Sequence, residues 1–198
     1  MALPEGTLNE LSLFTGVGGG MLGGHLTNFR TVAAVEFSEY CREILLRRQR
    51  DGLLPMFPIW DDIRSFDGRP FRGRIDVVTG GFPCQPFSTA GKGLGKDDPR
   101  NMWPDTARVI REVVPRWAFL ENVPGLLNHV YCKTIFSDLA EAGYDAEWGV
   151  LSASAIGAPH KRARLWILAT RQEPVGDVVD SPDEGAVREA GSGSQTPG

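Results

Sequence analysis

The sequence is poor in cysteine and has no long apolar run, and both features narrow its class. Its 198 residues include three cysteines, Cys41, Cys84 and Cys132, with no C-x-x-C pair. This odd, unpaired set argues against a disulfide framework or a zinc site and favours a reducing cytosol. No stretch approaches the roughly 20 apolar residues that span a bilayer, and no secretory signal is visible. We therefore expect a cytoplasmic protein with neither a membrane segment nor a metal.

The sequence also lacks the excess of basic residues that nucleic-acid-binding domains usually carry. Its formal net charge is −4, but residues 171–198 alone hold two basic and six acidic side chains. Residues 1–170 are therefore neutral, with 19 charges of each sign. A neutral body can still carry a basic groove, so the charge gives no positive support for a nucleic-acid partner and does not exclude one.

What the chain does have is an alternation of short apolar runs with helical patterns of ten to fifteen residues. The alternation predicts an α/β fold with a mostly parallel sheet, helices on both faces and ligands at the carboxyl ends of the strands. We assign this domain to residues 1–171, and residues 172–198, rich in Gly, Ser, Pro and acids, to a disordered tail or a truncated further region. Ser38 is a suitable N-cap. The predicted strands cover 8–15, 31–35, 75–79, 117–120 and 165–169, and the predicted helices 39–50, 101–114 and 131–142.

A glycine-rich turn, Phe14-Thr-Gly-Val-Gly-Gly19, follows the first predicted strand. Glycines there let a ligand approach the backbone closely, and Glu36 ends the next strand, where a carboxylate commonly holds ribose hydroxyls. NAD, FAD and S-adenosylmethionine all fit such a turn. Met21 breaks the G-x-G-x-x-G spacing of dinucleotide sites, which tilts the choice away from NAD and FAD. Asp62 is a candidate ligand for an adenine amino group, or else a helix N-cap.

The most informative segment is Gly80-Gly-Phe-Pro-Cys-Gln-Pro-Phe-Ser88, just past the third predicted strand. Its Cys84 lies between two prolines in a constrained, exposed loop, which suits a nucleophile, although free cysteines are more often buried. Glu121 follows another strand and would share that cleft, where it could bind a heterocyclic nitrogen during thiolate attack. A surface acid or a helix cap is the alternative. Arg162 and Arg164 face one side and suit a base carbonyl or a phosphate, or else a solvated strand edge.

Taken in order, these segments resemble the DNA cytosine-5 methyltransferase family. The resemblance implies a Rossmann-like S-adenosylmethionine-dependent methyltransferase fold and runs almost continuously from Leu8 to about Thr170. This sequence departs from the family pattern in two ways. The larger departure is a missing region, because the family continues into a target-recognition region and then returns to the catalytic domain with a closing helix. A smaller one is His160, where the family often has glutamine. The motifs are the F-x-G-x-G-G turn of Phe14–Gly19, Glu36, Asp62-Ile63, Pro83-Cys84-Gln85, Glu121-Asn122-Val123 and the R-x-R of Arg162 and Arg164.

The resemblance implies methyl transfer from S-adenosylmethionine to C5 of cytosine in double-stranded DNA, in the cytoplasm of a bacterium or of a phage-infected host. Cys84 would add to C6 of a flipped cytosine, Glu121 would bind N3 and the amino group, and Arg164 would bind O2. Arg162 would order the loop or a phosphate, and Phe37 would lie beside the adenine. The remaining assignments are Phe14, Gly16, Gly18, Gly19, Glu36, Asp62 and Pro83 to the cofactor and Gln85, Ser88 and Asn122 to the substrate.

Several readings remain beside an enzyme that is complete in this chain. A second polypeptide could carry the missing recognition region, or truncation could have removed it. The chain could be a remnant that binds cofactor or DNA without turnover, or it could act on transfer RNA, as a sister group does. An NAD-linked oxidoreductase would use the glycine turn and Glu36. That last reading leaves the segments around Cys84 and Glu121 without a role.

Overall fold

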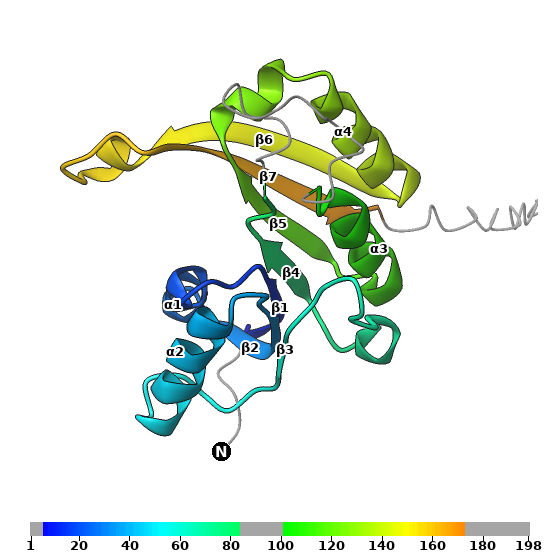
Figure 1. Ribbon diagram of the computed structural model, residues 1–198. Helices are drawn as coiled ribbons and strands as arrows, with labels where there is room; N and C mark the ends of the chain where they lie inside the picture. The colour runs from blue at the N-terminus through cyan, green and yellow to red at the C-terminus, as the bar shows by residue number, and fades with distance from the viewer. Residues whose placement is uncertain (1–5, 84–100, 173–198) are drawn as a thin grey trace, which may run out of the picture.

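The computed structural model describes residues 6–83 and 101–172, and Figure 1 shows how their elements are arranged. Cys84, Gln85 and Ser88 lie outside the described residues, so their predicted roles stay predictions. So does the domain boundary at residue 171. The elements are β1 (Leu8–Leu13), α1 (Gly19–Leu26), β2 (Phe29–Val35), α2 (Glu39–Arg50), β3 (Ile59–Trp60), η1 (Arg69–Phe71), β4 (Val77–Gly80), α3 (Trp103–Val113), β5 (Trp117–Asn122), η4 (Pro124–Asn128), α4 (Tyr131–Glu141), β6 (Tyr144–Ser152), η5 (Ala153–Ile156) and β7 (Ala163–Arg171).

The strands form one sheet in the order β3-β2-β1-β4-β5-β7-β6. Strands β1 to β5 are parallel, whereas β7 runs antiparallel to both β5 and β6. The predicted mostly parallel sheet is therefore confirmed. The carboxyl ends of β1 to β5 share one edge of the sheet, and β7 begins at that same edge because it runs the other way.

Helices cover both faces of the sheet, as predicted (Figure 1). On one face α3 and α4 pack Ile110 and Ile135 against strand residues of the main core. On the other face Met21 of α1 and Leu45 of α2 form a smaller cluster around Ala34 of β2. Since α1 and α2 pack on the β2 side, they leave the central strands of that second face without a helix among the described residues.

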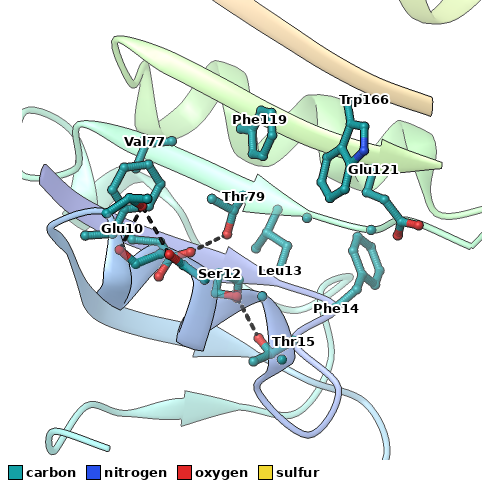
Figure 2. A pocket seen from close by; sticks show the side chains of 18 of the residues that line it. Glu10, Ser12, Leu13, Phe14, Thr15, Val77, Thr79, Phe119, Glu121 and Trp166 are labelled. Carbon is teal, nitrogen blue, oxygen red and sulfur yellow. Dashed lines mark hydrogen bonds between the residues drawn. The ribbon is translucent and has the colours of Figure 1, made fainter. Parts of the chain in front are cut away.

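We call this uncovered surface over β1, β4, β5 and β7 the open sheet face. Phe119 and Leu168 are 37% and 39% exposed there, and Trp166 stacks on Phe119 with ring centroids 5.1 Å apart. Glu10 is buried beneath the face and accepts hydrogen bonds from the hydroxyls of Thr31 (2.7 Å) and Thr79 (2.6 Å). The face lines a cavity of about 930 Å³, which Figure 2 shows from close by.

The sequence patterns located most elements but missed two strands. Strand β3 has two residues, too few to show the alternation of apolar and polar side chains that marks a strand. Strand β6 does show this alternation, but most of its residues are exposed, so the strand has no buried apolar face. In contrast, α2 spans the predicted residues, and the Ser38 hydroxyl accepts a hydrogen bond from the Cys41 amide (3.4 Å) at its N-cap. No helix within residues 6–83 and 101–172 is long and apolar enough to cross a membrane.

Candidate functional site

The predicted site residues that the structure describes gather at the carboxyl edge of the sheet. Phe14 follows β1, Glu36 follows β2, Asp62 follows β3 and Pro83 lies three residues beyond β4. Glu121 belongs to β5 itself, because this strand runs two residues further than predicted. Ligands of open α/β sheets bind at this edge. The edge therefore brings together segments that are far apart in the sequence.

The glycine turn and Glu36 form one hydrogen-bonded unit. The Glu36 carboxylate accepts from the amide of Gly16 (2.6 Å) and from that of Ser38 (2.8 Å), and it is largely buried. Gly18 has a φ of +89°, and a Cβ there would lie 3.0 Å from Leu45 Cδ2, so both its conformation and its space favour glycine. Two amides fix the carboxylate while leaving oxygen lone pairs free, which suits ribose hydroxyls.

Phe37 and Asp62 lie beside this unit, joined by an arginine that the sequence analysis had not singled out. The Arg64 guanidinium lies 5.8 Å from the centre of the Phe37 ring and donates to Asp62 Oδ2 (2.7 Å). These hydrogen bonds hold the pKa of Asp62 below its usual value. Asp62 also accepts from the Arg64 amide (3.0 Å), so it closes a turn and does not cap a helix. An aromatic ring beside a fixed carboxylate suits an adenine and its amino group.

At the other end of the site, Glu121 forms an ion pair with Arg164. A Cβ at Gly81 would lie 2.7 Å from Glu121 Oε2, so the chain entering the Pro83 segment passes directly against this carboxylate. Arg162 lines the same cavity, is exposed, and has a φ of +23°, a conformation that is strained for a non-glycine residue. Figure 2 shows Glu121 and Phe14 together at one end of the cavity, with Glu10 at the other.

Asn122 braces the segment that leads to Pro83. Its side chain is 3% exposed, its amide donates to the Phe82 carbonyl (3.1 Å), and its oxygen accepts from the Val123 amide (2.8 Å). Phe82 packs on Trp103 with ring centroids 5.2 Å apart, which anchors the same segment to the core. The substrate-binding role of Asn122 stays a prediction, whereas these contacts give it a structural task at β5.

Asn122→Ala is expected to lower the free energy of unfolding by about 1–3 kcal/mol, because the buried Phe82 carbonyl would lose its partner. Thermal unfolding checks this, at roughly 2–4 °C of Tm per kcal/mol for a chain of this size. Asn128→Ala, at the exposed end of η4, is the matched control. An unchanged Tm together with a raised KM for DNA would instead support substrate binding.

The cavity collects only some of the predicted residues. Phe14, Gly19, Glu121, Arg162 and Arg164 line it. A second group of predicted residues does not line the cavity: Glu36, Phe37 and Asp62. It is connected to the glycine turn by the hydrogen bond from the Gly16 amide to Glu36.

Sequence reasoning also missed Arg42, which donates to the carbonyls of Glu36 (3.0 Å) and Phe37 (2.5 Å) and so fixes the chain between them. For Arg64, the D-x-R spacing with Asp62 was an available signal. Within residues 6–83 and 101–172, no group of three or more His, Cys, Asp or Glu side chains could hold a metal ion.

Comparison with known proteins places this arrangement. Residues 8–186 match the family model of the C-5 cytosine-specific DNA methylase. The chain is 36% identical over 172 residues to the type II methyltransferase M.NgoMIV of Neisseria gonorrhoeae, covering 83% of this chain and 52% of that protein. It is 34% identical over 180 residues to M.AquIA of a Picosynechococcus species, covering 81% and 71%. The S. pombe Dnmt2 methyltransferase superposes with a TM-score of 0.67 at 25% identity, covering 91% and 58%.

The chain thus spans about half the length of M.NgoMIV and somewhat more of M.AquIA. The match nevertheless includes the glycine turn, Glu36, Glu121 and both arginines at the carboxyl edge. The fold is the Rossmann-like fold of S-adenosylmethionine-dependent methyltransferases, as predicted. The chain therefore belongs to the C-5 cytosine-specific DNA methylase family.

Proposed function

We propose that this chain transfers a methyl group from S-adenosylmethionine to C5 of cytosine in double-stranded DNA. The observation that carries the proposal is the Glu121–Arg164 pair, which faces the Gly81–Pro83 segment at the edge that also holds Glu36. Such a pair offers to one edge of a pyrimidine ring a guanidinium and a carboxyl group that, in its protonated form, donates to N3. The residue following Pro83 is Cys84, whose thiolate would attack that ring.

The residues of the cofactor end fit S-adenosylmethionine. Glu36 would hold the ribose hydroxyls, Asp62 the adenine amino group and Phe37 the adenine ring, with the backbone of the glycine turn close to the ligand. When bound, the cofactor supplies an electrophilic methyl group on a sulfonium. The bound cofactor would have to present that methyl toward Cys84 and Glu121. Phe14, which lines the cavity with Glu121, belongs to the same glycine turn as Gly16, whose amide holds Glu36.

Cys84 and Glu121 would share the work on a cytosine flipped out of the duplex. The Cys84 thiolate forms a bond to C6 while Glu121 protonates or hydrogen-bonds N3, so the ring electrons move toward C5. Arg164 holds O2 and keeps Glu121 oriented. After C5 has taken the methyl group, its proton leaves to solvent, the C6–sulfur bond breaks and the thiolate is regenerated.

The direct test is transfer of labelled methyl from S-adenosylmethionine to unmethylated genomic DNA and, in a parallel reaction, to transfer RNA, with the modified nucleoside identified by mass spectrometry. Label recovered as 5-methylcytidine in transfer RNA, with none in DNA, would replace DNA by RNA as the substrate. Label in neither would contradict activity of the chain alone. Calorimetry with S-adenosylmethionine and with NAD then separates a methyltransferase lacking a component from the oxidoreductase reading.

The open sheet face favours a second candidate, an enzyme half that needs further polypeptide. Strands of a mostly parallel sheet are normally covered on both faces, yet Phe119 and Leu168 are exposed. A second polypeptide carrying the target-recognition region would cover this face and complete the cofactor pocket. The test adds the unmatched half of a family relative in trans. Tighter cofactor binding and new methyl transfer would support the two-part enzyme, and unchanged values would contradict it.

Arg64→Gln is expected to weaken cofactor binding most as the pH falls toward the ordinary pKa of an aspartate, about 4. Arg64 lowers the pKa of Asp62, so the native carboxylate stays ionised as the pH falls, and removing Arg64 raises that pKa toward its ordinary value. Binding should then be lost at a higher pH in the variant, as calorimetry with S-adenosylhomocysteine can measure. Arg69→Gln is the matched control, because Arg69 pairs with Asp67 in the same spacing outside the site. Parallel pH profiles for all three proteins would contradict the role of Asp62.

A further inference from the structure

Strands β6 and β7 continue beyond the sheet as a two-stranded ribbon. The last residue of β5, Asn122, pairs with Leu165, whereas β6 and β7 stay paired as far as Ser152 and Ala163. Residues 151–164, which we call the ribbon, therefore extend past the carboxyl edge without support from β5. Figure 1 shows this hairpin, in yellow and orange, reaching away from the body of the protein. Its base lies at the Glu121–Arg164 pair.

The ribbon carries positive charge and no acid. From Trp148 to Gln172 the sequence has no Asp or Glu, although the whole chain has 25 of them. His160, Lys161 and Arg162 are all exposed, and no carboxylate in the described part of the chain lies within ion-pair distance of them. Basic side chains without acidic partners suit phosphate groups. The neutral total of residues 1–170 conceals this local excess.

The tip of the ribbon presents an apolar side chain on a firmly built turn. Ile156 ends η5 and is 72% exposed. The Ser152 hydroxyl accepts from the Ala155 amide (3.2 Å), and Gly157 follows with a φ of +90°, so the turn is capped at both ends. Proteins that open DNA commonly insert such an apolar residue between base steps.

We propose that the ribbon docks on duplex DNA beside the target base, with Lys161 and His160 on phosphates and Ile156 inserted next to the flipped cytosine. The inference deepens the proposed function and rests on DNA being the substrate. The proposal rests on the position of the ribbon, whose base lies at the Glu121–Arg164 pair. A cytosine held by this pair would therefore leave its stack directly beside the ribbon. DNA bound there must pass along the acid-free surface, whose charge complements the phosphates.

The first arm of the test measures DNA binding without cofactor, so that it does not depend on methyl transfer. Anisotropy of a labelled duplex is recorded over a range of salt for the native chain, Lys161→Ala and the control Arg50→Ala. Arg50 ends α2 at the opposite edge of the sheet and is exposed. Lys161→Ala is expected to lower the slope of log K against log salt by about 1, with no change for Arg50→Ala. Equal slopes in all three proteins would overturn the phosphate contact.

The second arm tests Ile156 with a duplex that holds one mismatched cytosine and a neighbouring 2-aminopurine. A mismatched base leaves the stack at lower cost, so the probe requires no known target sequence. The native chain is expected to raise 2-aminopurine fluorescence, and Ile156→Ser to lose at least half of that rise while keeping the salt slope. The same rise with Ile156→Ser would overturn the inserted tip. Binding and unstacking that persist without any methyl transfer would contradict the proposed function and leave the ribbon's role standing.

Discussion

Replacing Cys84 with serine is expected to reduce methyl transfer to cytosine by about 10³-fold or more. The C6 attack requires a thiolate, and a serine hydroxyl is not ionised at neutral pH, so no adduct forms at a useful rate. Cofactor binding should be unchanged, because the substitution leaves Glu36 and Asp62, the predicted ligands of the cofactor, in place. Labelled methyl transfer gives the rate, and calorimetry gives the cofactor affinity. Cys41→Ser, on α2, is the matched control and should keep native activity.

A trapping experiment tests the same role of Cys84 by detecting the covalent adduct directly. DNA that contains 5-fluorocytosine cannot release a C5 proton, so the native chain should remain covalently bound to it and migrate as a larger species. Cys84→Ser should show no such species. Appreciable methyl transfer by Cys84→Ser, or a trapped adduct that persists in it, would mean that another group attacks the ring.

Glu121→Gln is expected to lower the rate of methyl transfer by about 10²–10⁴-fold. The amide keeps the shape that fits against Gly81 but cannot donate a proton to N3, and it removes the charge that orients Arg164. The loss should fall mainly on kcat, since the interaction strengthens as N3 becomes basic during attack. Steady-state kinetics with unmethylated DNA measures the split between kcat and KM.

Glu147→Gln is the matched control for this carboxylate. Glu147 lies on β6, is exposed and has no partner role in the site, so its variant should keep native kinetics. The trapped 5-fluorocytosine adduct should form more slowly with Glu121→Gln than with the native chain. A native kcat with Glu121→Gln would show that Glu121 and Arg164 form a structural ion pair only.

The contrast between α2 and β6 shows how far the sequence reaches into this fold. Helix α2 depends on contacts within a few residues, such as Ser38 with the Cys41 amide, and its predicted bounds are confirmed. Strand β6 depends on β7, its partner along the whole strand, and although its side chains alternate between apolar and polar, most of its residues are exposed. Patterns read along the chain detect a locally capped helix and the buried apolar strands, but they missed the exposed strand β6.

The candidate site likewise contains residues that could be placed from the order of the motifs and contacts that depend on the folded chain. Parallel strands bring their carboxyl ends to one edge, so the order of motifs was sufficient to predict that Glu36 and Glu121 share it. The Arg42 contact could not be predicted, because it is made to a backbone carbonyl whose position follows from the folded turn, whereas the D-x-R spacing was an available signal for Arg64 and Asp62. The bracing of Phe82 by Asn122 joins β5 to the loop after β4, and nothing in either segment alone indicates it.

Trp166, which stacks on Phe119 on the open sheet face, is an intrinsic fluorophore whose emission depends on how far that face is exposed to solvent. Trp166 lies against Phe119 at a surface that is partly open to solvent, whereas Trp103 is fully buried. Anything that covers the face would move the Trp166 indole into a drier environment and shift its emission to the blue. If a second polypeptide binds this face, as proposed above, its titration should therefore shift the contribution of Trp166 to the intrinsic fluorescence, which is added to that of the exposed Trp60 and Trp148.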